Sequence, residues 1–125
     1  MISKYIKGRL NSFKYAFSGI AELWKKEKNT RIYLFFTIAV LLAGVIFRIK
    51  VSEWIILIWI IGAIWSAEAV NSAVERTVDL STSEQKPLAK AAKDLAAGAV
   101  LILAICSVII GLIIFLPKLL VMIMY

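Results

Sequence analysis

The chain has 125 residues, of which 62% are hydrophobic, and its mean hydropathy is +0.88. A soluble domain of this length is about half apolar and has too small an interior to bury such an excess, so the composition predicts a single-domain integral membrane protein over residues 1–125. The net charge of +7 raises nucleic acid as a partner, but the basic residues flank apolar segments. This pattern favours the anionic membrane surface first and nucleotide phosphates second, and we expect no nucleic acid partner.

Residues 2–26 are predicted to form an amphipathic helix. Large apolar residues recur there at spacings of three and four, namely Ile6, Leu10, Phe13, Phe17, Ile20 and Trp24. A basic, aromatic-containing helix of this kind lies in the membrane interface, although packing on a soluble partner stays open as an alternative. Because basic residues interrupt the apolar ones from the start, we expect no cleavable signal peptide here.

Three apolar segments follow and are predicted to cross the bilayer. The first span covers 31–48, which is close to the minimum length when the arginines at its ends extend toward water. The second covers 54–79 and runs without a break from an apolar half into a polar half. The third covers 87–120, and Pro87 suits the first turn of a helix. The expected fold class is therefore all-α, with one interfacial helix and three transmembrane helices.

The distribution of lysine and arginine predicts the orientation in the membrane. The N-terminal segment and the loop region 76–93 are rich in basic residues, whereas the 48–53 loop and the C-terminal tail contain few. Basic loops stay on the cytoplasmic side. We therefore expect a multi-pass protein of the cytoplasmic membrane, with its N-terminus in the cytoplasm and its C-terminus outside.

The polar half of the second span carries acidic and amide groups at helical spacing. Glu68, Asn71, Ser72, Glu75 and Asp79 lie at i, i+3, i+4, i+7 and i+11, on one stripe of a helix. Carboxylates so placed repel one another and resist leaving water, so the stripe is expected to bind a cation, either a metal ion or a partner's lysine or arginine. The alternative is a solvated helix end with ordinary ion pairs.

The predicted topology brings further polar residues to the cytoplasmic interface beside this stripe. Glu27 and Glu75 are suitable oxygen ligands for Mg²⁺, and Lys93 next to Asp94 is suited to neutralise phosphate. Glu68 lies deeper, where burial disfavours its charged form, as suits a general base acting on a hydroxyl. The chain has no histidine and one cysteine, so acid–base chemistry rests on such carboxylates. These groups fit phosphoryl transfer to a lipid alcohol, although neither GxxxxGK[ST] nor a Gly-rich kinase loop is present.

The string Glu68-Ala-Val-Asn71-Ser-Ala-Val-Glu75-Arg-Thr-Val-Asp79, with Lys93-Asp94 downstream, resembles the signature of the prokaryotic diacylglycerol kinase family. The resemblance covers essentially the whole chain and implies a small membrane enzyme that acts as a homotrimer. It implies Glu68 as the catalytic base, Asn71 and Asp79 as supporting residues, and Glu27 with Glu75 as ligands of the Mg²⁺ that accompanies ATP. Further nucleotide contacts implied by the family are Tyr15, Glu84, Gln85, Lys86, Lys93 and Asp94.

The lipid substrate follows from resemblance alone. The segment Ser12-Phe-Lys-Tyr-Ala-Phe-Ser-Gly-Ile20 resembles the Gram-positive branch of the family, the undecaprenol kinases, which implies undecaprenol as the acceptor. Diacylglycerol stays open as the alternative lipid. In another class of function, the chain is a non-catalytic membrane subunit whose acidic stripe binds basic helices of a larger complex. By residue type alone, Lys86 and Lys90 are expected to face lipid headgroups rather than to be catalytic.

Overall fold

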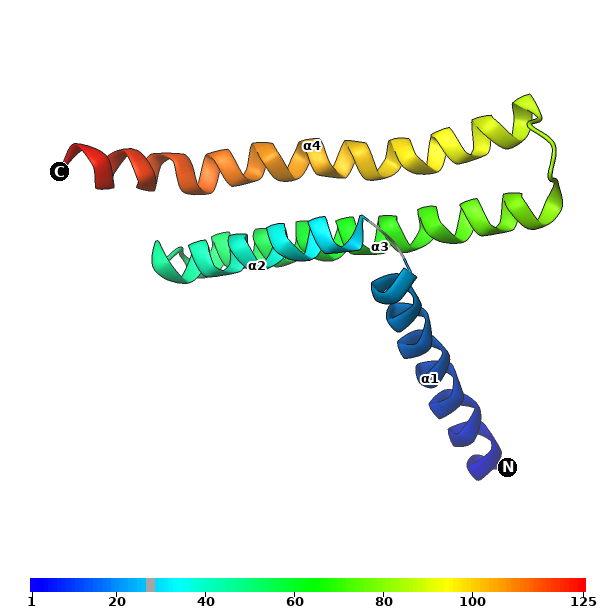
Figure 1. Cartoon of the computed structure of the whole chain (residues 1–125). Helices are drawn as coiled ribbons and strands as arrows, with labels where there is room; N and C mark the ends of the chain where they lie inside the picture. The colour runs from blue at the N-terminus through cyan, green and yellow to red at the C-terminus, as the bar shows by residue number, and fades with distance from the viewer. Residues whose placement is uncertain (27–28) are drawn as a thin grey trace. The chain divides into compact units, whose positions relative to one another are not determined.

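The computed structural model describes residues 1–26 and 29–125. In this part of the chain it contains four helices and no strand: α1 (Ile2–Lys26), α2 (Thr30–Ile46), α3 (Val51–Ser81) and α4 (Pro87–Met124) (Figure 1). The all-α prediction is confirmed, and each expected helix is present with bounds shifted by four residues or fewer. By internal contacts the chain divides into two units, Met1–Leu34 and Phe35–Tyr125.

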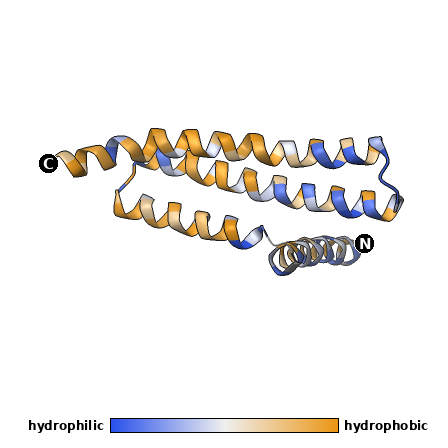
Figure 2. Ribbon diagram, turned by 45° about the horizontal axis from the view of Figure 1, so that its top comes forward, coloured by the Kyte–Doolittle hydropathy of each residue, from blue (hydrophilic) through white to orange (hydrophobic). Residues whose placement is uncertain are grey.

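The apolar surface of two helices suits a bilayer. α3 has 31 residues and α4 has 38, and both are long and apolar enough to cross a membrane. Figure 2 shows that hydrophobic residues dominate both helices except toward the loop that joins them, where polar residues take over. These two predicted spans are thereby supported by length and composition. The first predicted span corresponds to α2, whose 17 residues lie at the lower limit for a crossing.

In the first unit, α1 exposes most of its large apolar residues, from Ile6 to Trp24, whereas Leu23 near its end is buried. The Arg9 guanidinium lies over the ring of Tyr5, 5.2 Å from its centroid, and donates a hydrogen bond of 2.7 Å to the Tyr5 hydroxyl. At the far end of the unit, the buried Thr30 hydroxyl donates to the carbonyl of Leu23 (2.8 Å) and so satisfies a backbone acceptor near the end of α1. The predicted contact of α1 with the membrane interface remains a prediction.

The second unit is built on a hairpin of α3 and α4, which run antiparallel and lie side by side (Figures 1 and 2). Its apolar core lies at the end opposite the hairpin loop. There Ile49, Leu57 and Ile114 are buried together. At the same end the ammonium of Lys118 contacts Glu53 Oε1 at 2.6 Å, joining the start of α3 to the end of α4. These contacts fix how α3 and α4 are aligned along their length, and this alignment positions the polar residues at the other end.

The turn between α2 and α3 closes α2 with a Schellman motif. The Ile49 N–H donates to the carbonyl of Gly44 (3.1 Å) and the Arg48 N–H donates to the carbonyl of Val45 (3.2 Å). Arg48 takes the left-handed conformation that the motif requires, with φ at 49°. The turn brings Trp54, on the first turn of α3, back against the last turns of α2.

Gly44 is required by this close approach. A Cβ atom at Gly44 would lie 2.7 Å from Cη2 of Trp54 and 3.2 Å from Cδ1 of Ile49, whereas one at Gly62 would meet no heavy atom within 4 Å. We expect Gly44→Ala to lower the free energy of unfolding by about 1–2 kcal/mol, because the overpacking outweighs the gain in helix propensity. Gly62→Ala is the matched control, with no loss and a gain of up to about 1 kcal/mol. Thermal unfolding in detergent micelles measures both, and equal stability of the two variants would contradict the packing argument.

Candidate active site

The polar half of α3 separates into a buried part and an exposed part. Glu68, Asn71 and Ser72 are buried, with exposed fractions of 4%, 9% and 6%, whereas Glu75 and Asp79 are exposed nearer the hairpin loop. The predicted stripe therefore lies on one side of α3, as helical spacing requires, but only its deeper half is withdrawn from the surface. A buried carboxylate such as Glu68, on a helix long and apolar enough to cross a membrane, is a candidate functional residue.

Asn71 carries a polar atom that protein groups do not satisfy. Its side-chain N–H donates a long hydrogen bond of 3.5 Å to Glu75 Oε1, and its Oδ1 is buried without a hydrogen-bond partner among the described residues. An unsatisfied buried acceptor costs about 1–3 kcal/mol, so a group that supplies a positive charge or a proton donor there would be stabilising. An amide oxygen beside a carboxylate is a donor set that suits Mg²⁺.

Of the two predicted metal ligands, Glu27 and Glu75, only Glu75 lies within the described residues, where it is in place on α3. Glu27 lies outside the described residues. Within residues 1–26 and 29–125, no three acidic, histidine or cysteine side chains gather closely enough to hold a metal ion by themselves. The oxygen groups of Asn71 and Glu75 thus fit part of a magnesium site.

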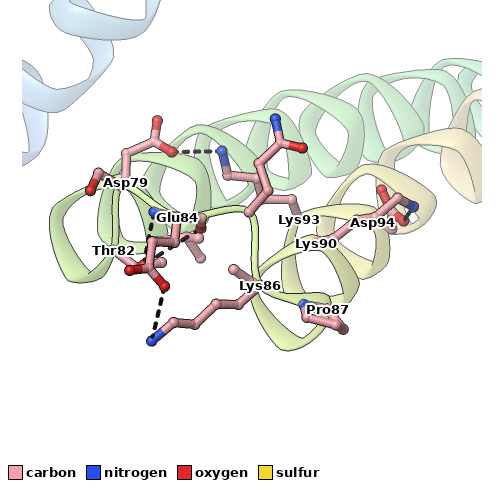
Figure 3. Close-up of a pocket in the computed structure, with 12 residues that line it drawn as sticks. Asp79, Thr82, Glu84, Lys86, Pro87, Lys90, Lys93 and Asp94 are labelled. Atoms are coloured by element: carbon pink, nitrogen blue, oxygen red, sulfur yellow. Dashed lines mark hydrogen bonds and ion pairs between the residues drawn. The ribbon is translucent and has the colours of Figure 1, made fainter.

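Beyond Glu75, the end of α3, the hairpin loop and the start of α4 enclose a hollow of about 620 Å³. The loop is held by the Thr82 N–H, which donates to Val78 (3.1 Å), and by the Thr82 hydroxyl, which accepts from the Glu84 N–H (3.1 Å). Pro87 begins α4, as predicted. Six residues predicted from the family resemblance line this hollow: Asp79, Glu84, Gln85, Lys86, Lys93 and Asp94. Figure 3 labels five of them, Asp79, Glu84, Lys86, Lys93 and Asp94, which come from both helices and the loop.

Lys93 joins the two helices across this hollow. Its ammonium contacts Asp79 Oδ1 at 2.6 Å, a pair formed between residues 14 positions apart. Lys93 lies on the polar first turns of α4, before the uncharged run 95–117. A lysine ammonium is positively charged at neutral pH, so Lys93 is suited to contact an anion.

Some predicted residues are not brought to the hollow. Glu68, Asn71 and Glu75 lie on earlier turns of α3 and do not line it. Tyr15 belongs to the first unit, which is described by itself, and is exposed there on α1. The structure thus gathers Asp79 with the predicted nucleotide contacts of the loop and α4, and the predicted base Glu68 lies on an earlier turn of α3.

The sequence reasoning missed several residues that line the hollow: Thr82, Ser83, Ala89 and Lys90. Lys90 also pairs with Asp94 one helical turn away, and the expectation that it faces lipid headgroups stays a prediction. The i,i+4 spacing of Lys90 and Asp94 was a visible signal for this pair, since such residues share one helix face.

Comparison with known proteins identifies the family. The family model described as prokaryotic diacylglycerol kinase matches residues 14–115, most of the chain and all the predicted site residues. The chain belongs to the prokaryotic diacylglycerol kinase family. Members of this family are lipid kinases, so the protein is a membrane enzyme that transfers phosphate to a lipid, and the alternative of a non-catalytic subunit is not supported.

Two curated relatives extend this result. The chain is 46% identical over 123 residues to the undecaprenol kinase of Bacillus subtilis, an alignment that covers 95% of this chain and 100% of that protein. It is 38% identical over 112 residues to the diacylglycerol kinase of Synechocystis sp., covering 89% of this chain and 64% of that protein. The predicted resemblance to the prokaryotic diacylglycerol kinase family is therefore confirmed over nearly the whole chain.

Proposed function

We propose that this kinase transfers the γ-phosphoryl group of ATP to the hydroxyl of undecaprenol and produces undecaprenyl phosphate and ADP. The main support for kinase chemistry is the hollow at the hairpin loop. Lysines of the loop and α4 line it, and one of them, Lys93, contacts Asp79 at the end of the acidic stripe on α3. The choice of undecaprenol is supported by the 46% identity with an undecaprenol kinase that the chain covers from end to end.

The residues divide between the two substrates. Lys93 and Lys86 neutralise nucleotide phosphates at the hollow, as charge-assisted contacts to phosphate do in other kinases. Glu68, buried in α3 between the hollow and the apolar half of the helix, accepts the proton of the lipid hydroxyl as its oxygen attacks the γ-phosphorus. Asn71 and Asp79 support the site, Asn71 beside Glu75 and Asp79 as the partner of Lys93.

Magnesium fits this arrangement. Glu75 would hold Mg²⁺, with the unsatisfied Oδ1 of Asn71 beside it and Glu27 as the second predicted carboxylate. When bound, the ion supplies positive charge that stabilises the phosphate oxygens. The nucleotide contact predicted for Tyr15 belongs to the same proposal.

Orientation and assembly complete the proposal. The basic residues at the hairpin loop support a cytoplasmic position for the hollow, where ATP is available, with the Glu53–Lys118 end outside. We also propose a homotrimer, because a hairpin with Glu75 and Asp79 exposed encloses the acidic stripe on one side only. A neighbouring copy would cover the other side.

A competition assay tests the lipid specificity. Purified protein receives γ-labelled ATP with Mg²⁺ and equal amounts of undecaprenol and diacylglycerol in the same micelles. We expect most of the label in undecaprenyl phosphate, because the chain is 46% identical to an undecaprenol kinase over nearly its whole length. Preferential labelling of phosphatidic acid would show that the acceptor is diacylglycerol, the lipid named for the relative from Synechocystis sp.. Absence of label in both lipids would overturn the kinase proposal for this chain.

A further inference from the structure

The hollow at the hairpin loop contains three lysines, and each is next to a carboxylate. Lys93 pairs with Asp79 across the two helices, and Lys90 pairs with Asp94 along α4. On the loop, the Lys86 ammonium lies 4.0 Å from Glu84. Figure 3 shows these pairs arranged around one hollow. Its lining therefore has three positive and three negative side chains, with a formal charge close to zero.

Lys90 has no role in the site as described so far. Lysine and aspartate four residues apart on a helix commonly form a surface pair that contributes little. Here, however, both members of the pair line the hollow, and Asp94 is itself a predicted nucleotide contact. The side chains of Lys90 and Asp94 are 77% and 62% exposed, so the pair is accessible to an incoming anion and is easily broken.

We propose that Lys90 is a third cation of the nucleotide-phosphate site and that the polyphosphate replaces Asp94 as its partner. This inference rests on the proposed kinase function, because the anion it assigns to the hollow is the triphosphate of ATP. Lys90 would act with Lys93 and Lys86, so that three ammonium groups face the three phosphates of the nucleotide.

The exchange of partners is physically simple. A lysine side chain is a point charge on a flexible stem with three rotatable donors, so its ammonium moves from a carboxylate to a phosphate without a change in the backbone. A triphosphate carries more charge than one carboxylate and accepts stronger charge-assisted hydrogen bonds. The contribution of Lys90 to binding should also increase with the number of phosphates in the ligand. Lys86, Lys90 and Lys93 occupy different positions in the lining, so only an extended anion can contact all three.

The experiment compares Lys90→Gln, Lys90→Arg and Lys50→Gln with the full-length parent protein. Lys50→Gln makes the same charge change before the first turn of α3, away from the hollow. Kinetics with ATP give KM and kcat for each variant. Isothermal calorimetry with tripolyphosphate and with AMP measures binding of two anions that differ in phosphate number and requires no turnover.

For Lys90→Gln we expect KM for ATP and the Kd for tripolyphosphate to rise about 5- to 10-fold, as for loss of one exposed charge-assisted contact. Binding of AMP should change less than 2-fold, Lys90→Arg should restore most of the affinity, and Lys50→Gln should behave as the parent. Unchanged KM and Kd in Lys90→Gln would overturn the assignment of Lys90 to the phosphate site. A fall in kcat alone would also overturn it, because the variant would then act through its pair Asp94 rather than on nucleotide binding. Should no lipid be phosphorylated, the proposed function fails, while tripolyphosphate binding still decides the role of Lys90.

Discussion

Replacing Glu68 with glutamine is expected to lower kcat by a factor of about 10²–10⁴, the usual contribution of a general base. Glutamine has the same size and fits the buried position, where Glu68 is 4% exposed, but its amide does not accept the proton of the lipid hydroxyl. Because Glu68 does not line the hollow, KM for ATP should stay within about 3-fold of the parent value. Initial rates of labelled lipid formation at saturating ATP measure the effect.

A matched variant separates chemistry from folding. Glu53→Gln makes the same carboxylate-to-amide change near the start of α3, where Glu53 contacts Lys118 rather than the candidate site. It should keep kcat near the parent value even if thermal stability falls slightly. Full activity of Glu68→Gln would remove Glu68 from the reaction. Loss of activity together with loss of helical signal in circular dichroism would show a structural role instead.

Lys93→Met is expected to raise KM for ATP by about 10- to 100-fold, the range for loss of a charge-assisted hydrogen bond. Lys93 is the lysine of the hollow with the least exposed side chain, at 39%, and its loss also leaves Asp79 without its 2.6 Å partner. The uncompensated carboxylate then repels the phosphates of the nucleotide. Steady-state kinetics at several ATP concentrations, with lipid saturating, measure the change.

A second substitution tests whether Asp79 repels the nucleotide phosphates when Lys93 is absent. In the Lys93→Met background, Asp79→Asn removes the uncompensated charge and should recover part of the lost affinity, about 3- to 10-fold in KM. Lys93→Arg keeps the positive charge and should remain closer to the parent than Lys93→Met. An unchanged KM in Lys93→Met, or a further increase on adding Asp79→Asn, would contradict the proposed electrostatic role of Lys93.

The helices of this protein were predictable from local patterns. The apolar periodicity of residues 2–26 predicted α1 with its observed bounds, and Pro87 predicted the start of α4. The i, i+3, i+4 and i+7 spacing from Glu68 to Glu75 predicted that these groups share one side of α3. Such features depend only on neighbours within a few turns of one helix, so the sequence alone determines them.

Membership of the family was equally visible in the sequence, because the residues from Glu68 to Asp79 and the Lys93-Asp94 pair are close to its signature. Residue types alone did not establish the lipid acceptor. Apolar residues of a spanning helix do not distinguish one lipid tail from another, so the choice of undecaprenol depends on similarity to a relative. The homotrimer and the roles of Glu27 and Tyr15 likewise remain predictions.

The tertiary structure decided which of these groups meet. The Lys93–Asp79 pair and the hollow around it depend on how α3 and α4 are aligned, which follows from the 82–86 loop and from packing at the opposite end of the hairpin. The same alignment buries Glu68 but leaves Glu75 exposed, and it places Lys90 beside the predicted nucleotide contacts. Contacts between helices arise from packing over the whole hairpin, and no local sequence pattern specifies them.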